Sequence, residues 1–437
     1  PNGAPPALPE LLGESAMFFV PKIDVHPFAP ASLVKGSLTL LKVISEKLLK
    51  VCRMDAVTFQ PNSKKLAELA SLLAVKQFHL EQAQPNRQKI IVLANFDEID
   101  PVQGSEVGLE IIPINLDSQG LAMPSDLEEK IEQSNEGLFG IWTNLATLFG
   151  PSNAVLLKSI HRARELGGKI IVDCEGLLSQ LPLLSAQNFP ADIITFEPLK
   201  AFGLPRQGSG LGVCPVLCKE ALARFLPSHP LHKEPAFTIK GSYSPQGRSL
   251  ASTPFSSVQA LALLFLHMHV FEKQTLQRMS EDSTEKTKFL FEKISKSFDV
   301  FTPGVDSSPI NRLYINFSNA RTELGVSAKN VAMRLSDFGF YPPKILESFS
   351  DIMLIELNHD SPLQEIEELA FAFESISDEL NLIKSGEFSK TCNPISEAPH
   401  IINDASFFEW NRPYSIERAV FPKSFRVKGA KSDEVDE

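Results

Sequence analysis

Two residues in the middle of the chain have the types and setting that a pyridine-based cofactor needs. Asp173 ends the apolar run Ile170–Asp173, and Lys200 follows the apolar run Ile193–Phe196. Ligands of α/β sheets bind outside the carboxyl ends of the strands. A lysine amine forms a Schiff base with an aldehyde, and a carboxylate facing a pyridine nitrogen keeps the ring an electron acceptor. The pair fits pyridoxal phosphate (PLP) chemistry, although such an Asp is more often a cap and a lone Lys a surface charge.

The segments around these residues predict an α/β fold. Continuous apolar runs suit strands that are buried on both faces of a parallel sheet. Such runs occur at residues 90–93, 111–114, 140–143, 170–173 and 193–196. Helical patterns lie between them, for example at Ser152–Leu166, which Gly167-Gly168 should end. Further along the chain, strand patterns at 311–317 and 352–357 accompany helical patterns at 327–338 and 363–380.

These patterns divide the chain into four parts. A length of 437 residues exceeds one small core. We expect an N-terminal arm (1–31), a large domain (32–270), a smaller C-terminal α+β domain (271–390) and a tail (391–437). The charged end of that tail, residues 428–437, should be disordered.

Bulk composition excludes several partners. A net charge of −11 disfavours nucleic acid and anionic membranes. Five cysteines without a CxxC pair suit a reducing compartment. The longest apolar stretch, Val258–Val270, is shorter than the roughly 18 residues of a spanning helix, and no targeting segment is expected at the start of the chain. No metal site is expected either, because His267 and His269, two apart on a helix, face different sides.

The strongest motif lies between Phe196 and Pro215. The sequence FEPLKAFGLPRQGSGLGVCP resembles LNLHKTF-x-x-PHGGGGPGxGP of the glycine decarboxylase P-protein, a decarboxylating glycine dehydrogenase of glycine catabolism. Five other segments resemble motifs of that family in the same order. They are 23–30 (ANIHPFAP), 54–63 (x-D-x-V-x-FQPNS), 224–230 (PFLPxHP), 337–343 (DYGFHAPT) and 410–422 (WDRPYSREVAAFP). The resemblance covers about residues 23–425 and is to the lysine-bearing C-terminal half of the family.

The resemblance implies a fold and a set of roles. The fold would be PLP fold-type I, with a mostly parallel seven-stranded sheet and helices on both faces in the large domain. Lys200 matches the Schiff-base lysine, Asp173 the aspartate at the pyridine nitrogen, and Thr143 a threonine beside the cofactor. Ser63 and Lys64 lie where the family turn approaches the PLP phosphate.

The implied partners follow from the same resemblance. The family decarboxylates glycine with PLP and passes the aminomethyl group to the lipoyl arm of H-protein. We expect a homodimer, or a heteromer with a P-protein-like N-terminal half. The compartment would be the cytoplasm, or the mitochondrial matrix if the source is eukaryotic.

Several positions depart from the family motifs. Lys64-Lys-Leu-Ala-Glu68 stands where the family has GAQGE, so both glycines, which allow close backbone approach, are gone. Asp97 replaces the ring-stacking histidine, Glu175 a small residue, and Leu199 the histidine before the lysine, and the GSCTMK motif is absent from residues 1–22. Losing one such group costs orders of magnitude in rate.

Three hypotheses stay open at this point. The first is a divergent PLP-dependent glycine decarboxylase. The second is a catalytically degenerate subunit, a pseudoenzyme that retains the fold. The third is another fold-type I enzyme with a changed substrate.

Overall fold

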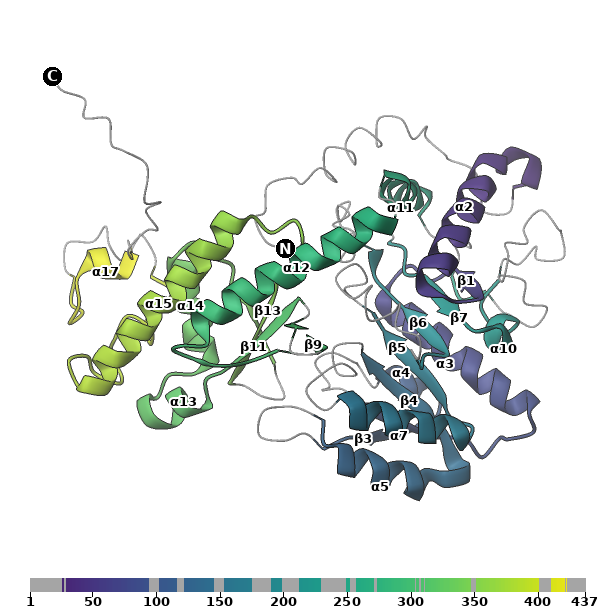
Figure 1. Cartoon of the computed structure of the whole chain (residues 1–437), viewed down its shortest axis with the longest axis horizontal. Helices are drawn as coiled ribbons and strands as arrows, with labels where there is room; N and C mark the ends of the chain where they lie inside the picture. Colours follow the sequence, from purple (N-terminus) through teal and green to yellow (C-terminus); the bar gives the residue numbers. More distant parts are fainter. Residues whose placement is uncertain are drawn as a thin grey trace. The chain divides into compact units, whose positions relative to one another are not determined.

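The chain forms two compact units in the computed structural model (Figure 1). Residues 5–284 and 303–311 make up the sheet unit, and residues 1–4, 285–302 and 312–437 the C-terminal unit. The structure describes residues 26, 29–93, 102–115, 122–144, 153–174, 190–198, 212–228, 249–251, 257–270, 273–302, 304–305, 308–309, 311–346, 351–400, 410–420 and 422.

A seven-stranded sheet forms the core of the sheet unit. The strand order is β1-β7-β6-β5-β4-β2-β3. β7 runs antiparallel to its two neighbours, β6 and β1, and the other neighbouring strands run parallel. The bounds are β1 Ala56–Thr58, β2 Lys89–Leu93, β3 Glu110–Pro113, β4 Leu138–Asn144, β5 Lys169–Asp173, β6 Ile193–Thr195 and β7 Val216–Cys218. The predicted mostly parallel sheet and its five apolar strands are confirmed.

Helices cover both faces of this sheet because both faces of its strands are apolar. One face packs on α3 (Lys64–Glu81), α4 (Val102–Glu106) and α10 (Glu220–Ala223). The other face packs on helices that contribute to a second core cluster: α2 (Lys35–Cys52), α5 (Pro124–Ser134), α7 (Asn153–Glu165) and α11 (Val258–Val270). Each fully buried aliphatic side chain contributes about 1.5–3 kcal/mol to such a core.

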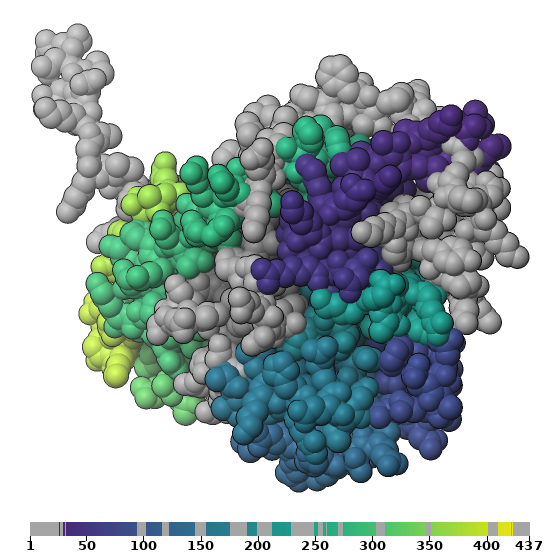
Figure 2. All heavy atoms as spheres, turned by 45° about the vertical axis from the view of Figure 1, so that its right-hand side comes forward, coloured from purple at the N-terminus to yellow at the C-terminus, as the bar shows by residue number. Residues whose placement is uncertain are grey.

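Helix α2 packs on the second face of the sheet and lies at the surface of the sheet unit. It lies beside α11 (Figure 1), and the Lys47 ammonium donates to the Met268 carbonyl of α11 at 2.8 Å. In Figure 2 the purple atoms of α2 lie against the teal atoms of the α10 region. There the Lys219 ammonium donates to the Arg53 carbonyl that follows α2. The short elements η1 (Ala31–Leu33), η2 (Asn135–Gly137), β9 (Gly304–Val305) and β10 (Ser308–Pro309) complete the described part of this unit.

The C-terminal unit is built on a four-stranded antiparallel sheet. Its order is β12-β13-β11-β8, with β8 Asp299–Phe301, β11 Arg312–Asn316, β12 Lys344–Ile345 and β13 Ile352–Glu356. Its helices are α13 (Ser318–Leu324), α14 (Ala328–Asp337), α15 (Leu363–Ser385) and α17 (Ile416–Val420), and α12 (Lys273–Ile294) runs from the residues of the sheet unit into those of this one. The α+β pattern predicted for this region is confirmed.

Two expectations about the chain's organisation are not decided by these elements. The predicted four-part division stays a prediction, and residues 428–437, expected to be disordered, lie outside the described residues. Within the described part, no helix combines the length and the apolar character needed to cross a membrane.

Candidate functional site

The carboxyl ends of the central strands bring polar residues into one row. Asn144 at the end of β4, Asp173 at the end of β5 and Thr195 at the end of β6 are in register with one another. Asp173 is 3% exposed, and the Cys174 N–H that follows it donates to the Thr195 carbonyl at 2.7 Å. The strand pairing therefore fixes the backbone on which the Asp173 carboxylate stands.

Helix α3 brings a lysine to this carboxylate. The ammonium nitrogen of Lys64, the first residue of α3, lies 2.6 Å from Oδ2 of Asp173. The helix begins there because the Ser63 hydroxyl accepts a hydrogen bond from the Leu66 N–H at 3.4 Å, an N-cap of the common type. The structure thus unites Ser63, Lys64 and Asp173, which the sequence had placed in two separate motifs.

Thr143 does not share the side of the sheet on which Asp173 lies. It is in register with Leu93 of β2 and Val172 of β5, whose side chains belong to the core beneath α2 and α7. Successive side chains of a strand point to opposite faces, so the register directs Thr143 away from α3. Its buried hydroxyl donates to the Leu93 carbonyl at 2.7 Å. That bond ties two strand ends together.

The loop before α3 is held by residues from distant motifs. The Gln60 side chain donates to the Ser228 carbonyl at 3.0 Å, and its oxygen accepts from the N–H groups of Leu250 and Ala251. Thr58 donates to the Pro227 carbonyl at 2.9 Å. The segment 54–63 is thereby fastened to the segment 224–230, two of the motifs that carried the resemblance.

Gly212 and Cys214, near the end of the 196–215 motif, also contact this loop. The Cys214 N–H donates to the Pro61 carbonyl at 2.9 Å. A Cβ on Gly212 would lie 2.9 Å from the Asn62 carbonyl oxygen, closer than real Cβ atoms come. Glycine is needed here for close backbone approach. Gln60 helps to build the site and had not been singled out from the sequence, where its only signal was its place in a matched motif.

Buried thiols beside Asp173 are not nucleophiles. Burial raises the pKa of Cys174 well above its usual value, and the negative charge of Asp173 raises it further. The Cys214 thiol donates to the Phe196 carbonyl at 3.2 Å, and its pKa is raised well above its usual value, first by burial and then by Asp173. A thiol needs a lowered pKa to react as thiolate, so these two cysteines serve packing.

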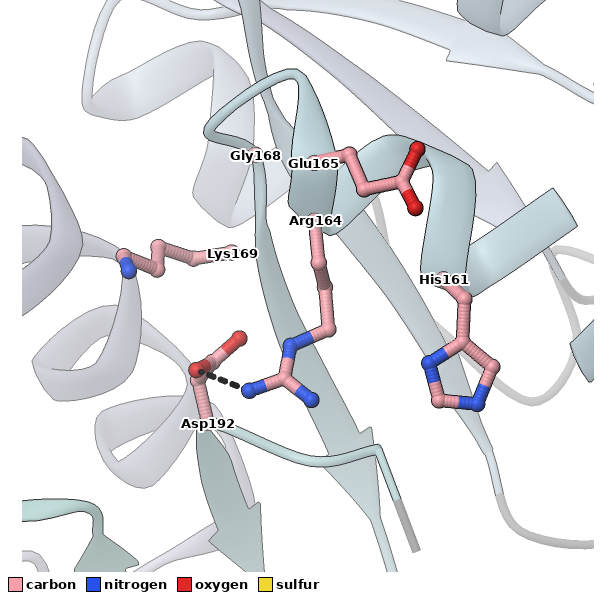
Figure 3. Close-up of a pocket in the computed structure, with 6 residues that line it drawn as sticks. All are labelled: His161, Arg164, Glu165, Gly168, Lys169 and Asp192. Atoms are coloured by element: carbon pink, nitrogen blue, oxygen red, sulfur yellow. Dashed lines mark hydrogen bonds and ion pairs between the residues drawn. The ribbon is translucent and has the colours of Figure 1, made fainter. Parts of the chain in front are cut away.

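A separate pocket of about 360 Å³ lies at the amino ends of the strands, opposite the end at which Asp173 stands (Figure 3). It is lined by His161, Arg164, Glu165, Gly168, Lys169 and Asp192. Gly168 and Lys169 stand at the start of β5 and Asp192 just before β6, so these are the amino ends of the strands.

The charged groups of this pocket have structural partners. In Figure 3 the Lys169 side chain points away from His161, and the Lys169 ammonium lies 4.4 Å from the ring centroid of Phe78. Asp192 accepts from the Ile170 N–H at 2.9 Å and lies 3.5 Å from Arg164. No residue predicted for the site lines this pocket, so the Asp173 edge is the candidate site.

Comparison with known proteins tests the predicted family. Residues 280–400 match the family model for the glycine dehydrogenase C-terminal domain. Glycine dehydrogenase (decarboxylating) of Pelagibacter ubique is 24% identical over 400 residues, which cover 92% of this chain and 41% of the relative. The predicted resemblance to the P-protein is confirmed. The chain spans about two-fifths of the length of the curated relatives that it matches.

Solved structures share the fold. The inhibitor-bound glycine decarboxylase (P-protein) of the glycine cleavage system has a TM-score of 0.61 at 13% identity, covering 85% of this chain and 82% of that chain. Oryza sativa TDC with PLP has a TM-score of 0.61 at 12% identity, covering 87% of this chain and 82% of that chain. At such identities the likeness establishes the fold alone, and the predicted fold-type I architecture is confirmed.

The P-protein resemblance allows the fit of PLP to be judged on the described residues. An acidic residue at the pyridine nitrogen is the usual partner of that ring, and Asp173 is the residue that the resemblance implies for this role. The Lys64 ammonium already lies on this carboxylate at 2.6 Å. A carboxylate can accept several hydrogen bonds, but a protonated ring nitrogen on Asp173 would lie close to the like-charged Lys64 ammonium. The described residues therefore do not suit PLP while Lys64 stays on this carboxylate. Lys200, Asp97, Glu175 and Leu199 lie outside the described residues.

Proposed function

We propose that this chain is a P-protein-like subunit that keeps the fold of a PLP enzyme without turning over glycine. The observation that supports this most is the 2.6 Å contact between the Lys64 ammonium and the Asp173 carboxylate. PLP chemistry depends on a carboxylate that faces the ring nitrogen. In this chain that carboxylate has a covalently tethered cation beside it.

Electrostatics favour the tethered cation over an incoming ligand. Asp173 is 3% exposed and Lys64 25% exposed, so the pair is shielded from most solvent screening. A protonated ring would have to lie beside the like-charged ammonium or displace it, and it would also bear the entropy of association, which the tethered ammonium does not. Asp97 and Glu175, where the family has a histidine and a small residue, would add negative charge near an anionic cofactor.

A second candidate function is PLP-dependent glycine decarboxylation with aminomethyl transfer to lipoyl H-protein. The name of the Pelagibacter ubique relative and the presence of both Asp173 and Lys200 favour it. In that case Lys200 would hold the cofactor, Asp173 would maintain the charge on its ring, and Ser63 and Lys64 would lie toward its phosphate. Thr143 would support the strand ends. PLP, when bound, supplies the electron acceptor that decarboxylation of glycine needs.

The expected partners belong to the same proposal. The chain matches about two-fifths of its relatives' length, so a P-protein-like N-terminal half, or a second copy of this chain, is the proposed partner. H-protein is proposed as a docking partner for either function. The cytoplasm, or the mitochondrial matrix in a eukaryote, stays the proposed compartment.

A trapping experiment separates the two functions. The purified protein, with any chain that copurifies, is incubated with micromolar PLP, reduced with borohydride and analysed by peptide mass spectrometry beside Lys200→Ala. Release of carbon dioxide from glycine is measured with lipoyl H-protein present, and an intact P-protein serves as the positive control. We expect neither a stoichiometric Lys200 adduct nor carbon dioxide above the Lys200→Ala level. A stoichiometric adduct with turnover would establish the second function instead.

A further inference from the structure

We infer that Lys64 supplies to Asp173 the positive charge that a protonated cofactor ring would otherwise bring, so that the carboxylate binds a protonated pyridine more tightly when Lys64 is removed. This inference rests on the proposed function and names the residue that controls the site. It concerns binding and stability, whereas the proposed function concerns turnover.

The backbone holds both partners of the ion pair in place. Lys64 opens an 18-residue helix whose start is fixed by the Ser63 cap. Asp173 ends a strand paired on both sides, with Asn144 and Thr195 opposite it. Little conformational freedom remains to be lost when the lysine reaches the carboxylate, because only its own side-chain rotamers need to be fixed. The contact is therefore built into the fold.

The charge around the site also requires a cation. A carboxylate as buried as Asp173 needs a counter-charge or strong hydrogen bonds. Asp173, Glu197 and Glu68 act together to raise the pKa of the Cys214 thiol after burial has raised it, whereas Lys64 lowers it. Glu68 is itself buried on α3. Lys64 therefore offsets an acidic neighbourhood in addition to pairing with one oxygen.

The chemistry of the contact defines the ligand that could replace Lys64. Oδ2 of Asp173 lies 2.6 Å from the Lys64 ammonium, an N⁺–H donor, which is close enough for a charge-assisted hydrogen bond. A protonated pyridine offers one such donor on a flat, largely apolar ring. When Lys64 is absent, the carboxylate should bind this class of cation.

The test uses Lys64→Gly, with Lys65→Gly as the matched control. Both changes put glycine into the first turn of α3, so they share the helix-propensity cost, but Lys65 is exposed. The probe is pyridoxine, which has the ring nitrogen but neither phosphate nor aldehyde. Binding is followed by ligand-detected NMR and stability by thermal melting.

We expect Lys64→Gly to melt lower than Lys65→Gly, and pyridoxine to raise its melting temperature. Because a tethered group competes at a high effective concentration, pyridoxine should bind Lys64→Gly at least about tenfold more tightly than it binds wild type. The double variant Lys64→Gly/Asp173→Asn should lose this gain. If Lys64→Gly does not fold, Lys64→Met keeps the aliphatic stem and is measured in the same way.

Equal melting and equal pyridoxine affinity for the two lysine variants would overturn the inference and leave the proposed function standing. Glycine turnover by the wild type would overturn the proposed function, whatever the lysine variants do.

Discussion

Two buried clusters of opposite charges, one in each unit, differ in how firmly the cation is held. In the sheet unit, Lys64 reaches Asp173 with its ammonium and stays 25% exposed. In the C-terminal unit, Arg334 is fully buried and contacts Glu379 at 2.7 and 3.0 Å and Asp337 at 2.7 Å. The first cluster is an ion pair at the carboxyl edge of the seven-stranded sheet, and the second is a buried network of several hydrogen bonds.

The guanidinium of Arg334 explains the difference. It has five N–H donors in a fixed plane. Besides the two carboxylates, it donates to the carbonyls of Ala419 at 2.9 Å and Arg418 at 2.7 Å. Burial alone would lower the pKa of Arg334, but hydrogen bonds and charge from Glu379 and Asp337 raise it above its usual value. Arg334, which lies on α14, thereby links this helix to α15 and α17.

The network extends to the last matched motif. Asp337 accepts from the His400 N–H and from its Nδ1, both at 2.7 Å, and the Tyr414 hydroxyl lies 3.0 Å from Nε2 of His400. The Trp410 indole N–H donates to the Tyr414 carbonyl. The motifs at 337–343 and 410–422 therefore meet through His400. These two motifs therefore contribute to the packing of the C-terminal unit, whereas we propose a binding site at the Lys64 pair.

The largest expected effect is at Arg334. Arg334→Met leaves two buried carboxylates without their cation, so the free energy of unfolding should fall by about 3–5 kcal/mol. Chemical denaturation with a fluorescence readout measures the change. The matched control is Arg321→Met, a half-exposed arginine 3.0 Å from Asp351 in the same unit, for which the loss should stay within about 1 kcal/mol. Equal losses for the two variants would show that the buried network is no stronger than a surface pair.

A second expected effect is a loss of stability at low pH that arises from His79 and from neither of the two ion-pair clusters. Burial lowers the pKa of His79 from 6.5 to about 4, the hydrogen bond from its ring to the Phe139 carbonyl opposes this, and the charges of Arg87 and Lys169 add to the lowering. The folded state therefore prefers neutral His79. Its contribution is present above the unfolded-state pKa and is lost as the pH falls from 6.5 toward 4, by about 3 kcal/mol in total.

His79→Gln removes this titration and keeps a donor for the Phe139 carbonyl. We expect the stability of the variant to fall less steeply over that pH range than that of wild type, as measured by urea titrations at each pH. Parallel stability curves for the two proteins would contradict the assignment.

The smallest expected effects are at the caps of two helices. Ser327 and Asn330 exchange reciprocal hydrogen bonds at the start of α14, at 3.3 and 3.1 Å, whereas Ser63 caps α3 through one longer contact. Ser327→Ala should cost about 1–2 kcal/mol and Ser63→Ala about 0.5–1 kcal/mol. Thermal melts rank the two. A larger loss from Ser63→Ala would mean that the start of α3, and with it Lys64, is held more firmly than the comparison implies.

The sequence predicted the strands better than the site. Continuous apolar runs such as Ile90–Leu93 and Ile170–Asp173 specify strands buried on both faces, and the structure has them there. Asp173 was predicted at the carboxyl edge for the same reason. Lys64 was predicted to lie toward a phosphate, because it stands where the family turn approaches the PLP phosphate. Its contact with Asp173 depends on how α3 crosses the sheet, a tertiary property that neither segment encodes alone.

Thr143 shows the same limit. The resemblance implied a place beside a cofactor for Thr143, and that role stays a prediction. Because Thr143 precedes Asn144 by one residue, its side chain points to the other face of the sheet. An apolar run that is buried on both faces does not indicate which face each of its residues takes.

The most direct test of the account is the coupling between Lys64 and Asp173. Unfolding free energies of wild type, Lys64→Met, Asp173→Asn and the double variant, measured without added cofactor, form a double-mutant cycle. A built-in ion pair predicts a favourable coupling on the order of 1–2 kcal/mol, with each single variant less stable than wild type. A coupling of zero within error, or a Lys64→Met variant as stable as wild type, would contradict the claim that this lysine holds the place of a cofactor.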